Sequence, residues 1–154
     1  VARRDDLERP LVLLSSSGTP LLEAVRSAGA VYPGCLRNVR AVAAHLAAHH
    51  ARVTLIGAAT RGQFREEDQL CCARIAMRLC AAGFTVADEA TAAVMRRWAD
   101  ARPERILGGA SASFLRRSGQ VDDLNFIVRH VDDLDAVYRL SAGEIVKEGV
   151  ASCA

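Results

Sequence analysis

Apolar positions along the chain form either short continuous runs or longer stretches with helical spacing. Residues 11–14, 30–32 and 53–56 are runs with the length and content of strands buried on both faces. A stretch of helical period follows each run, and we expect helices at residues 21–28, at 36–49 and from Glu66 to a stop at Gly83. The first half of the chain therefore predicts three successive β-loop-α units.

The pattern of the second half is less regular. We expect a helix at residues 87–99, with Ala90, Val94 and Trp98 on one side, and a short helix at 111–117. Residues 106–107 fit a short strand, and residues 125–131 fit either a strand or a helix. The pair of segments at 137–140 and 145–146 predicts a β-hairpin near the end of the chain.

Strands that alternate with helices predict an α/β fold. The sheet should be mostly parallel with helices on both faces, plus the C-terminal β-hairpin, because parallel strands need such crossovers. We expect a charged junction at residues 1–9, a single α/β domain at 10–150 and a short tail at 151–154. Ligands of such sheets bind in the loops beyond the carboxyl ends of the strands, so we searched those loops for chemistry.

Composition narrows the possible functions. The chain has 154 residues, of which 51% are hydrophobic and 25% charged, as is usual for a globular domain. Its net charge of +2 is spread along the sequence, so we expect no nucleic-acid partner, and no apolar run approaches the roughly 20 residues of a membrane span. The five cysteines are an odd number without a CxxC pair, which favours reduced thiols and a cytoplasmic location.

A hydroxyl-rich loop joins the first predicted strand to the first predicted helix. It contains Ser15, Ser16, Ser17, Gly18 and Thr19. Backbone N–H groups and hydroxyls at such a junction can bind an anion such as phosphate. A tight turn with Thr19 as the helix cap explains the same residues without any ligand.

Three acidic residues, Glu66, Glu67 and Asp68, open the third predicted helix. Negative charge is favoured at a helix N-terminus, so complementation of the helix dipole is a sufficient structural explanation. Carboxylates are also the ligands that Mg²⁺ prefers, and Mg²⁺ often bridges to a substrate phosphate. Both interpretations remain open on the residues alone.

Other clusters of reactive residues fit known sites less well. Cys35 and Arg40 are one residue too close together for the cysteine phosphatase signature, so we expect Cys35 to be a small residue at a helix start. His45 and His49 lack the Glu of a zinc-protease helix, and we interpret them as solvent-facing.

In the order of its segments the chain resembles the 2-phosphosulfolactate phosphatase family. The segments are LVLLSSSGTPLLEAV, GCLRNVRAVAAHLAAHHARVTLIGA, FREEDQLCCARIAMRL and SASFLRRSGQVDDLNF, and the likeness runs from residue 10 to about 146. The resemblance implies a magnesium-dependent phosphatase that releases phosphate from 2-phosphosulfolactate or a similar small phosphorylated acid, a step towards coenzyme M.

The same resemblance implies roles for individual residues. It assigns phosphate binding to the loop from Ser15 to Thr19 and to Arg37 and Asn38. It assigns Mg²⁺ binding to Glu67 and Asp68, which with Asp123 are the implied catalytic residues.

The family's chains are longer and begin with a half that has motifs of its own. We therefore expect an N-terminal half, or a second copy of the chain, as a partner. The alternative to a phosphatase is a non-catalytic module or degenerate relative that binds an anion or the partner half without turnover. A nucleotide- or flavin-phosphate-binding domain is a further alternative, because it shares the strand-loop-helix arrangement.

Overall fold

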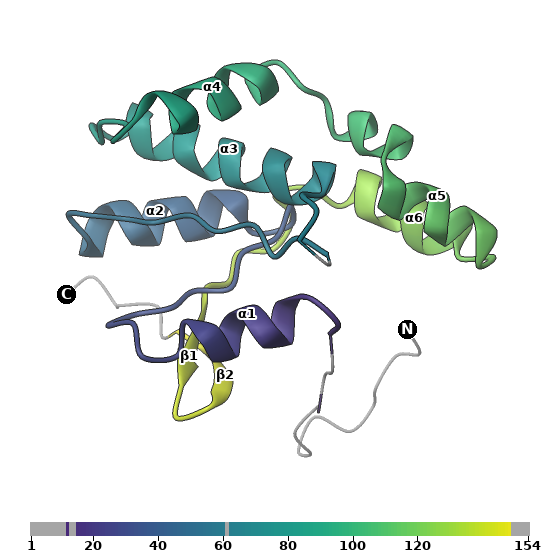
Figure 1. Ribbon diagram of the computed structural model, residues 1–154. Helices are drawn as coiled ribbons and strands as arrows, with labels where there is room; N and C mark the ends of the chain where they lie inside the picture. The colour runs from purple at the N-terminus through teal and green to yellow at the C-terminus, as the bar shows by residue number, and fades with distance from the viewer. Residues whose placement is uncertain (1–11, 13–14, 61, 149–154) are drawn as a thin grey trace.

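The computed structural model describes residues 12, 15–60 and 62–148. Within them the chain is a mixed α/β fold of six α-helices, one 3-10 helix and one β-hairpin (Figure 1). The elements in order are α1 (Gly18–Ala24), α2 (Val39–His49), α3 (Glu66–Ala81), α4 (Glu89–Trp98), η1 (Pro103–Gly108), α5 (Ala110–Arg117), α6 (Val121–Arg129), β1 (Tyr138–Ser141) and β2 (Glu144–Lys147). In the described ranges, no helix combines the length and the apolarity that a membrane crossing needs.

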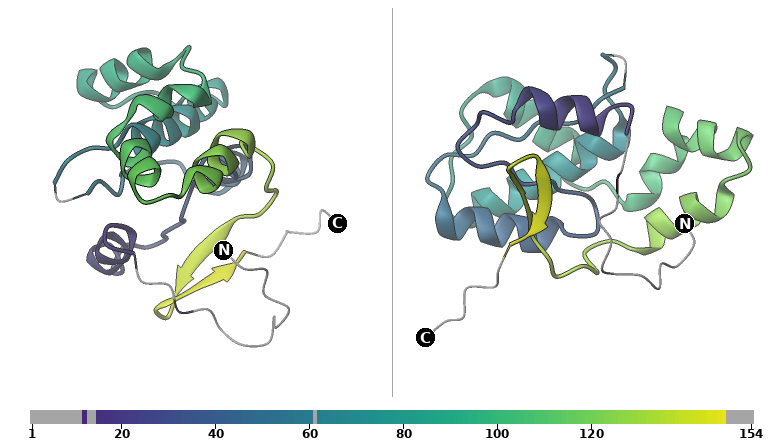
Figure 2. Two further views of the ribbon diagram at one scale, coloured as in Figure 1. Left: turned by 90° about the vertical axis from the view of Figure 1, so that its right-hand side faces the viewer. Right: turned by 90° about the horizontal axis from the view of Figure 1, so that it is seen from below.

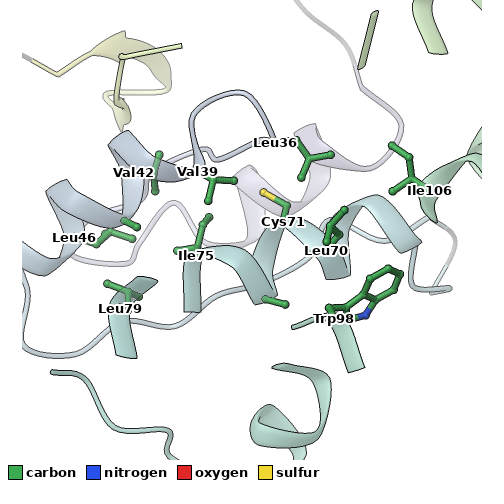
Figure 3. Packing of buried hydrophobic residues seen from close by; sticks show 12 residues of the cluster. Leu36, Val39, Val42, Leu46, Leu70, Cys71, Ile75, Leu79, Trp98 and Ile106 are labelled. Carbon is green, nitrogen blue, oxygen red and sulfur yellow. The ribbon is translucent and has the colours of Figure 1, made fainter. Parts of the chain in front are cut away.

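The hydrophobic core lies between α2 and α3 (Figure 3). Both helices bury a stripe with helical spacing, as the sequence predicts; the stripes consist of Val39, Val42, Ala43 and Leu46 on α2 and of Leu70, Ala73, Ile75, Ala76 and Leu79 on α3. Trp98 at the end of α4 is only 1% exposed, and its Nε1 donates a hydrogen bond of 2.9 Å to Gln69 Oε1. On α3 Cys71 is also buried, whereas Cys72 is half-buried.

The segment after α6 is tied to the start of α2. The backbone N–H of Asp132 donates to Leu36 O, and that of Leu134 to Arg37 O, both at 2.9 Å. The predicted hairpin follows and is confirmed, with Tyr138 opposite Lys147 at its open end. Its two-residue turn has φ of 50° at Ala142 and 84° at Gly143, and positive φ at both positions is the type I′ geometry that matches strand twist.

Among the described residues the one sheet is this antiparallel hairpin, and a parallel sheet is not formed. Residues 30–35 and 52–59 form neither helix nor strand and have no ladder partner there, so the strands predicted at 30–32 and 53–56 are not formed among the described residues. An extended segment becomes a strand only when a neighbour pairs with its N–H and C=O groups, which its own sequence cannot provide. Except for Val12, the first predicted strand, residues 11–14, lies outside the described residues.

Three further local predictions are corrected or decided by the structure. Residues 106–107 lie in η1 and not in a strand, because Pro103 begins a helical turn that ends at Gly108. The ambiguous segment from residue 125 is helical as far as Arg129. The helix expected at 21–28 begins earlier, at Gly18, and ends at Ala24.

Two groups of elements lie on opposite sides of the extended segments. Figure 1 shows α2, α3 and α4 as successive layers on one side, and α1 with the hairpin on the other. The left view of Figure 2 shows α1 apart from the helical layers. The helices α5 and α6 pack against each other and against η1 at one end of the molecule.

Candidate functional site

The hydroxyl-rich loop meets a second loop that is distant in sequence. Ser17 Oγ lies 3.1 Å from Thr60 Oγ1, in a hydrogen bond in which either hydroxyl can be the donor. Ser17 precedes α1, and Thr60 lies in the connection between the extended segment 52–59 and α3. Sequence analysis had treated the second loop only as a connection, although a polar loop after a predicted strand is where such folds place their ligands.

Hydrogen bonds within the first loop fix its shape. Ser15 Oγ accepts from the backbone N–H of Gly18 at 3.1 Å and from that of Ser17 at 3.4 Å. Thr19 Oγ1 in turn accepts from the backbone N–H of Ser15 at 3.0 Å. Both hydroxyl oxygens therefore act as acceptors for the loop's own amides, and a phosphate oxygen would replace Ser15 Oγ if it bound the same N–H groups.

Asp68, in the first turn of α3, lies beside the second loop. Its Oδ2 accepts from the backbone N–H of Ala59 at 2.8 Å, next to Thr60. Burial raises the pKa of Asp68 above its usual value; the Ala59 hydrogen bond opposes this shift, and the charge of Glu67 adds to it. Gly57 allows this approach, because a Cβ there would lie 3.2 Å from Asp68 Cβ. The structure thus places a partly buried carboxylate, held in a fixed direction, next to the two hydroxyl loops.

Two apolar grooves flank the unpaired extended segment, and Asp68 lines both of them. The larger groove, about 480 Å³, lies between α1, residues 30–34, residues 52–58 and the start of α3. The smaller, about 210 Å³, is lined by the same extended segment together with Phe64, Cys72 and Met95. Asp68 is the one carboxylate among the residues that line these two grooves.

The predicted magnesium ligands differ in their surroundings. Asp68 borders the grooves, whereas Glu67 lines neither of them. Neighbouring residues on a helix point about 100° apart, which separates the two carboxylates. No group of three possible metal ligands occurs in the part of the chain that the structure describes. Asp68 has the chemistry to hold Mg²⁺ together with phosphate oxygens and water, the usual arrangement for this ion.

Arg37 and Asn38, implied as phosphate ligands, contact the C-terminal segment instead of the serine loop. Asn38 is 2% exposed; its Oδ1 accepts from Cys35 N at 2.8 Å, and its Nδ2 donates to Ala136 O at 3.1 Å. Arg37 forms a two-pronged ion pair with Asp133, at 2.8 and 3.2 Å. This pair and a hydrogen bond from His130 hold the pKa of Asp133 at about 2.

Within the described ranges no contact brings Asp123, His45 or His49 to these loops, whereas His50 lines the larger groove with Asp68. Asp123 is exposed in the first turn of α6, which packs against α5 and η1. The imidazoles of His45 and His49 stack on each other with ring centres 4.3 Å apart, and burial lowers the pKa of His45. We had expected both histidines to face solvent. The structure corrects this for His45, which is partly buried, whereas His49 is exposed.

Two comparisons with known proteins agree with each other. A family model described as 2-phosphosulpholactate phosphatase matches residues 3–143. The 2-phosphosulfolactate phosphatase of Methanothermobacter thermautotrophicus is 32% identical over 139 residues, which cover 90% of this chain and 60% of that protein. The chain thus spans less than two thirds of the curated relative that it matches.

Proposed function

The chain belongs to the 2-phosphosulfolactate phosphatase family, and we propose that it takes part in hydrolysing a small phosphorylated acid, with 2-phosphosulfolactate as the first candidate. The observation that carries the proposal is the meeting of two hydroxyl loops beside a partly buried carboxylate. Hydrolysis breaks the P–O bond to the acid, water supplies the new oxygen on phosphorus, and the leaving oxygen takes up a proton.

Unused hydroxyl protons support phosphate binding at these loops. Each hydroxyl has one proton to donate, but Ser15 and Thr19 use their oxygens as acceptors in the hydrogen bonds described above. Ser17 and Thr60 share one hydrogen bond, which uses one of their two protons. Within the described residues the remaining protons have no acceptor, and phosphate oxygens would supply several at once.

Asp68 is the residue that we propose for the chemical step. A carboxyl with a raised pKa can hold a proton for the leaving oxygen, and as a carboxylate it can bind a cation. Magnesium, when bound, would neutralise charge on the phosphate, with Asp68 as the expected ligand and Glu67 as a second one if its side chain turns. Asp123, Arg37 and Asn38 have no contact that supports a direct role.

We also propose that a further protein portion completes the sheet around residues 53–57. This segment has an apolar groove on each side and no ladder partner among the described residues, and these features suit a central strand of a parallel sheet. The curated relative has the length to provide such a portion, because the match covers only 60% of it. We propose this N-terminal portion as the partner; a second copy is the alternative.

The location that we propose for this reaction is the cytoplasm. Cys35, Cys71, Cys72 and Cys80 are all free thiols in the structure, as is usual in a reducing compartment. Burial raises the pKa of Cys71 and Cys72, which makes both of them poor nucleophiles at neutral pH.

Phosphate release tests both the activity and the partner. The chain is assayed with 2-phosphosulfolactate and other small phosphorylated acids, with Mg²⁺ or with EDTA, alone and produced together with the unmatched portion of the Methanothermobacter relative. We expect Mg²⁺-dependent phosphate release that is faster from the co-purified complex than from the chain alone.

No release from a stable complex contradicts the phosphatase proposal and favours a non-catalytic module. Equal release by the chain alone contradicts the partner proposal, and a homodimer on size-exclusion chromatography favours the second copy.

A further inference from the structure

The backbone N–H and carbonyl of Thr60 are both paired with Gln63. Its N–H donates to Gln63 O at 2.8 Å, and its carbonyl accepts from Gln63 N at 3.0 Å. The loop also requires left-handed backbone at two positions, with φ of 55° at Ala59 and 75° at Gly62. Among contacts within the described residues, the backbone groups of Thr60 bond to Gln63 and its hydroxyl bonds to Ser17.

That hydroxyl links the two halves of the candidate site. On one side it contacts Ser17 of the serine loop at 3.1 Å. On the other, the residue before it donates its N–H to Asp68 at 2.8 Å. Thr60 thus lies between the hydroxyls suited to phosphate and the carboxylate suited to the chemical step.

We propose that Thr60 is a phosphate-binding residue: Ser17 donates its proton to Thr60 Oγ1, and Thr60 donates its own proton to one phosphoryl group. This inference rests on the proposed function, because it deepens the same site. One proton is used between the two hydroxyls, which leaves one proton of the pair available for an outside acceptor. A phosphate oxygen is such an acceptor, and its charge strengthens the hydrogen bond that it receives.

Binding of inorganic phosphate to single variants tests the inference. Thr60→Val removes the hydroxyl and keeps the shape, and Thr60→Ser keeps the hydroxyl. Thr85→Val makes the same change at an exposed threonine between α3 and α4, distant in sequence from both loops. By titration calorimetry we expect Thr60→Val to raise the Kd by about tenfold, as loss of one charge-assisted hydrogen bond predicts. Thr60→Ser and Thr85→Val should stay within about twofold of the unmodified chain.

The results of these titrations decide whether Thr60 binds phosphate. Unchanged affinity in Thr60→Val, or equal losses in Thr60→Val and Thr60→Ser, overturns the inference, as does failure of the unmodified chain to bind phosphate. If Thr60→Val does not fold, Ser17→Ala takes its place, and unchanged phosphate affinity in that variant overturns the proposed pair. Phosphate binding by the unmodified chain, with no phosphate release from its stable complex with the partner portion, contradicts the proposed function and leaves the assignment of Thr60 standing.

Discussion

Asp68→Asn is expected to lower the rate of phosphate release by about 100-fold or more while the protein stays folded. The amide keeps the size of the side chain, and its oxygen can still accept from Ala59 N, so the loop should retain its shape. It cannot hold a transferable proton, and it is a poor ligand for Mg²⁺. Initial rates at saturating substrate over a range of Mg²⁺ concentrations measure the effect.

Stability provides an independent readout for the same variant. In the folded protein Asp68 has a raised pKa, so it binds its proton at a higher pH than in the unfolded chain. Its contribution to stability is greatest below the unfolded pKa and is lost as the pH rises through the folded pKa. At pH 7 we therefore expect Asp68→Asn to melt at the same temperature as the unmodified protein or higher. A lower Tm together with retained activity would contradict both the raised pKa of Asp68 and its role in the chemical step.

Glu67→Gln is the matched comparison for Asp68→Asn. Glu67 is the adjacent carboxylate, but it lines neither groove. If Glu67 turns to share the ion, its variant needs more Mg²⁺ for the same rate and keeps most of its maximal rate. A loss as large as that of Asp68→Asn would show that the two carboxylates act as one unit.

The sequence predicted the helices well, because their signals are local. Residues with helical spacing on α2 and α3, such as Val39, Leu46 and Ile75, are buried together in the structure. The hairpin was also predictable, because two short apolar segments with a Gly-containing turn pair with each other. The amphipathic face of each helix can be read from its own residues, although that face is buried against another helix.

The sheet and the meeting of the two loops were not predictable in the same way. Strand formation by residues 53–56 depends on neighbours elsewhere in the chain or in a partner, and apolar content does not supply them. Similarly, the serine loop was recognised as a possible anion site, but nothing near Ser17 indicates that Thr60 lies beside it. Contacts between distant segments depend on the tertiary structure, which a single sequence does not reveal.

Asn38 can be assigned either of two roles, one in phosphate binding and one in stability. The family resemblance implies phosphate binding, whereas the structure buries the amide between Cys35 N and Ala136 O. Because a buried amide that bridges two segments satisfies one polar group on each, its removal leaves both without a partner. The structural role therefore predicts a loss of stability, and the ligand role predicts a loss of phosphate affinity.

Asn38→Ala should lower the free energy of unfolding by about 2–4 kcal/mol, since two partly or fully buried groups lose their hydrogen bonds. Equilibrium unfolding in urea, followed by far-UV circular dichroism, measures this loss. Arg37→Ala is the control at the adjacent position, where loss of an exposed ion pair with Asp133 should lower the free energy of unfolding much less. Phosphate affinity without urea should be unchanged in both variants as long as they are folded. A stable Asn38→Ala protein with a Kd for phosphate raised tenfold would instead place Asn38 in the phosphate site, as the family resemblance implies, and would require the start of α2 to turn towards the serine loop.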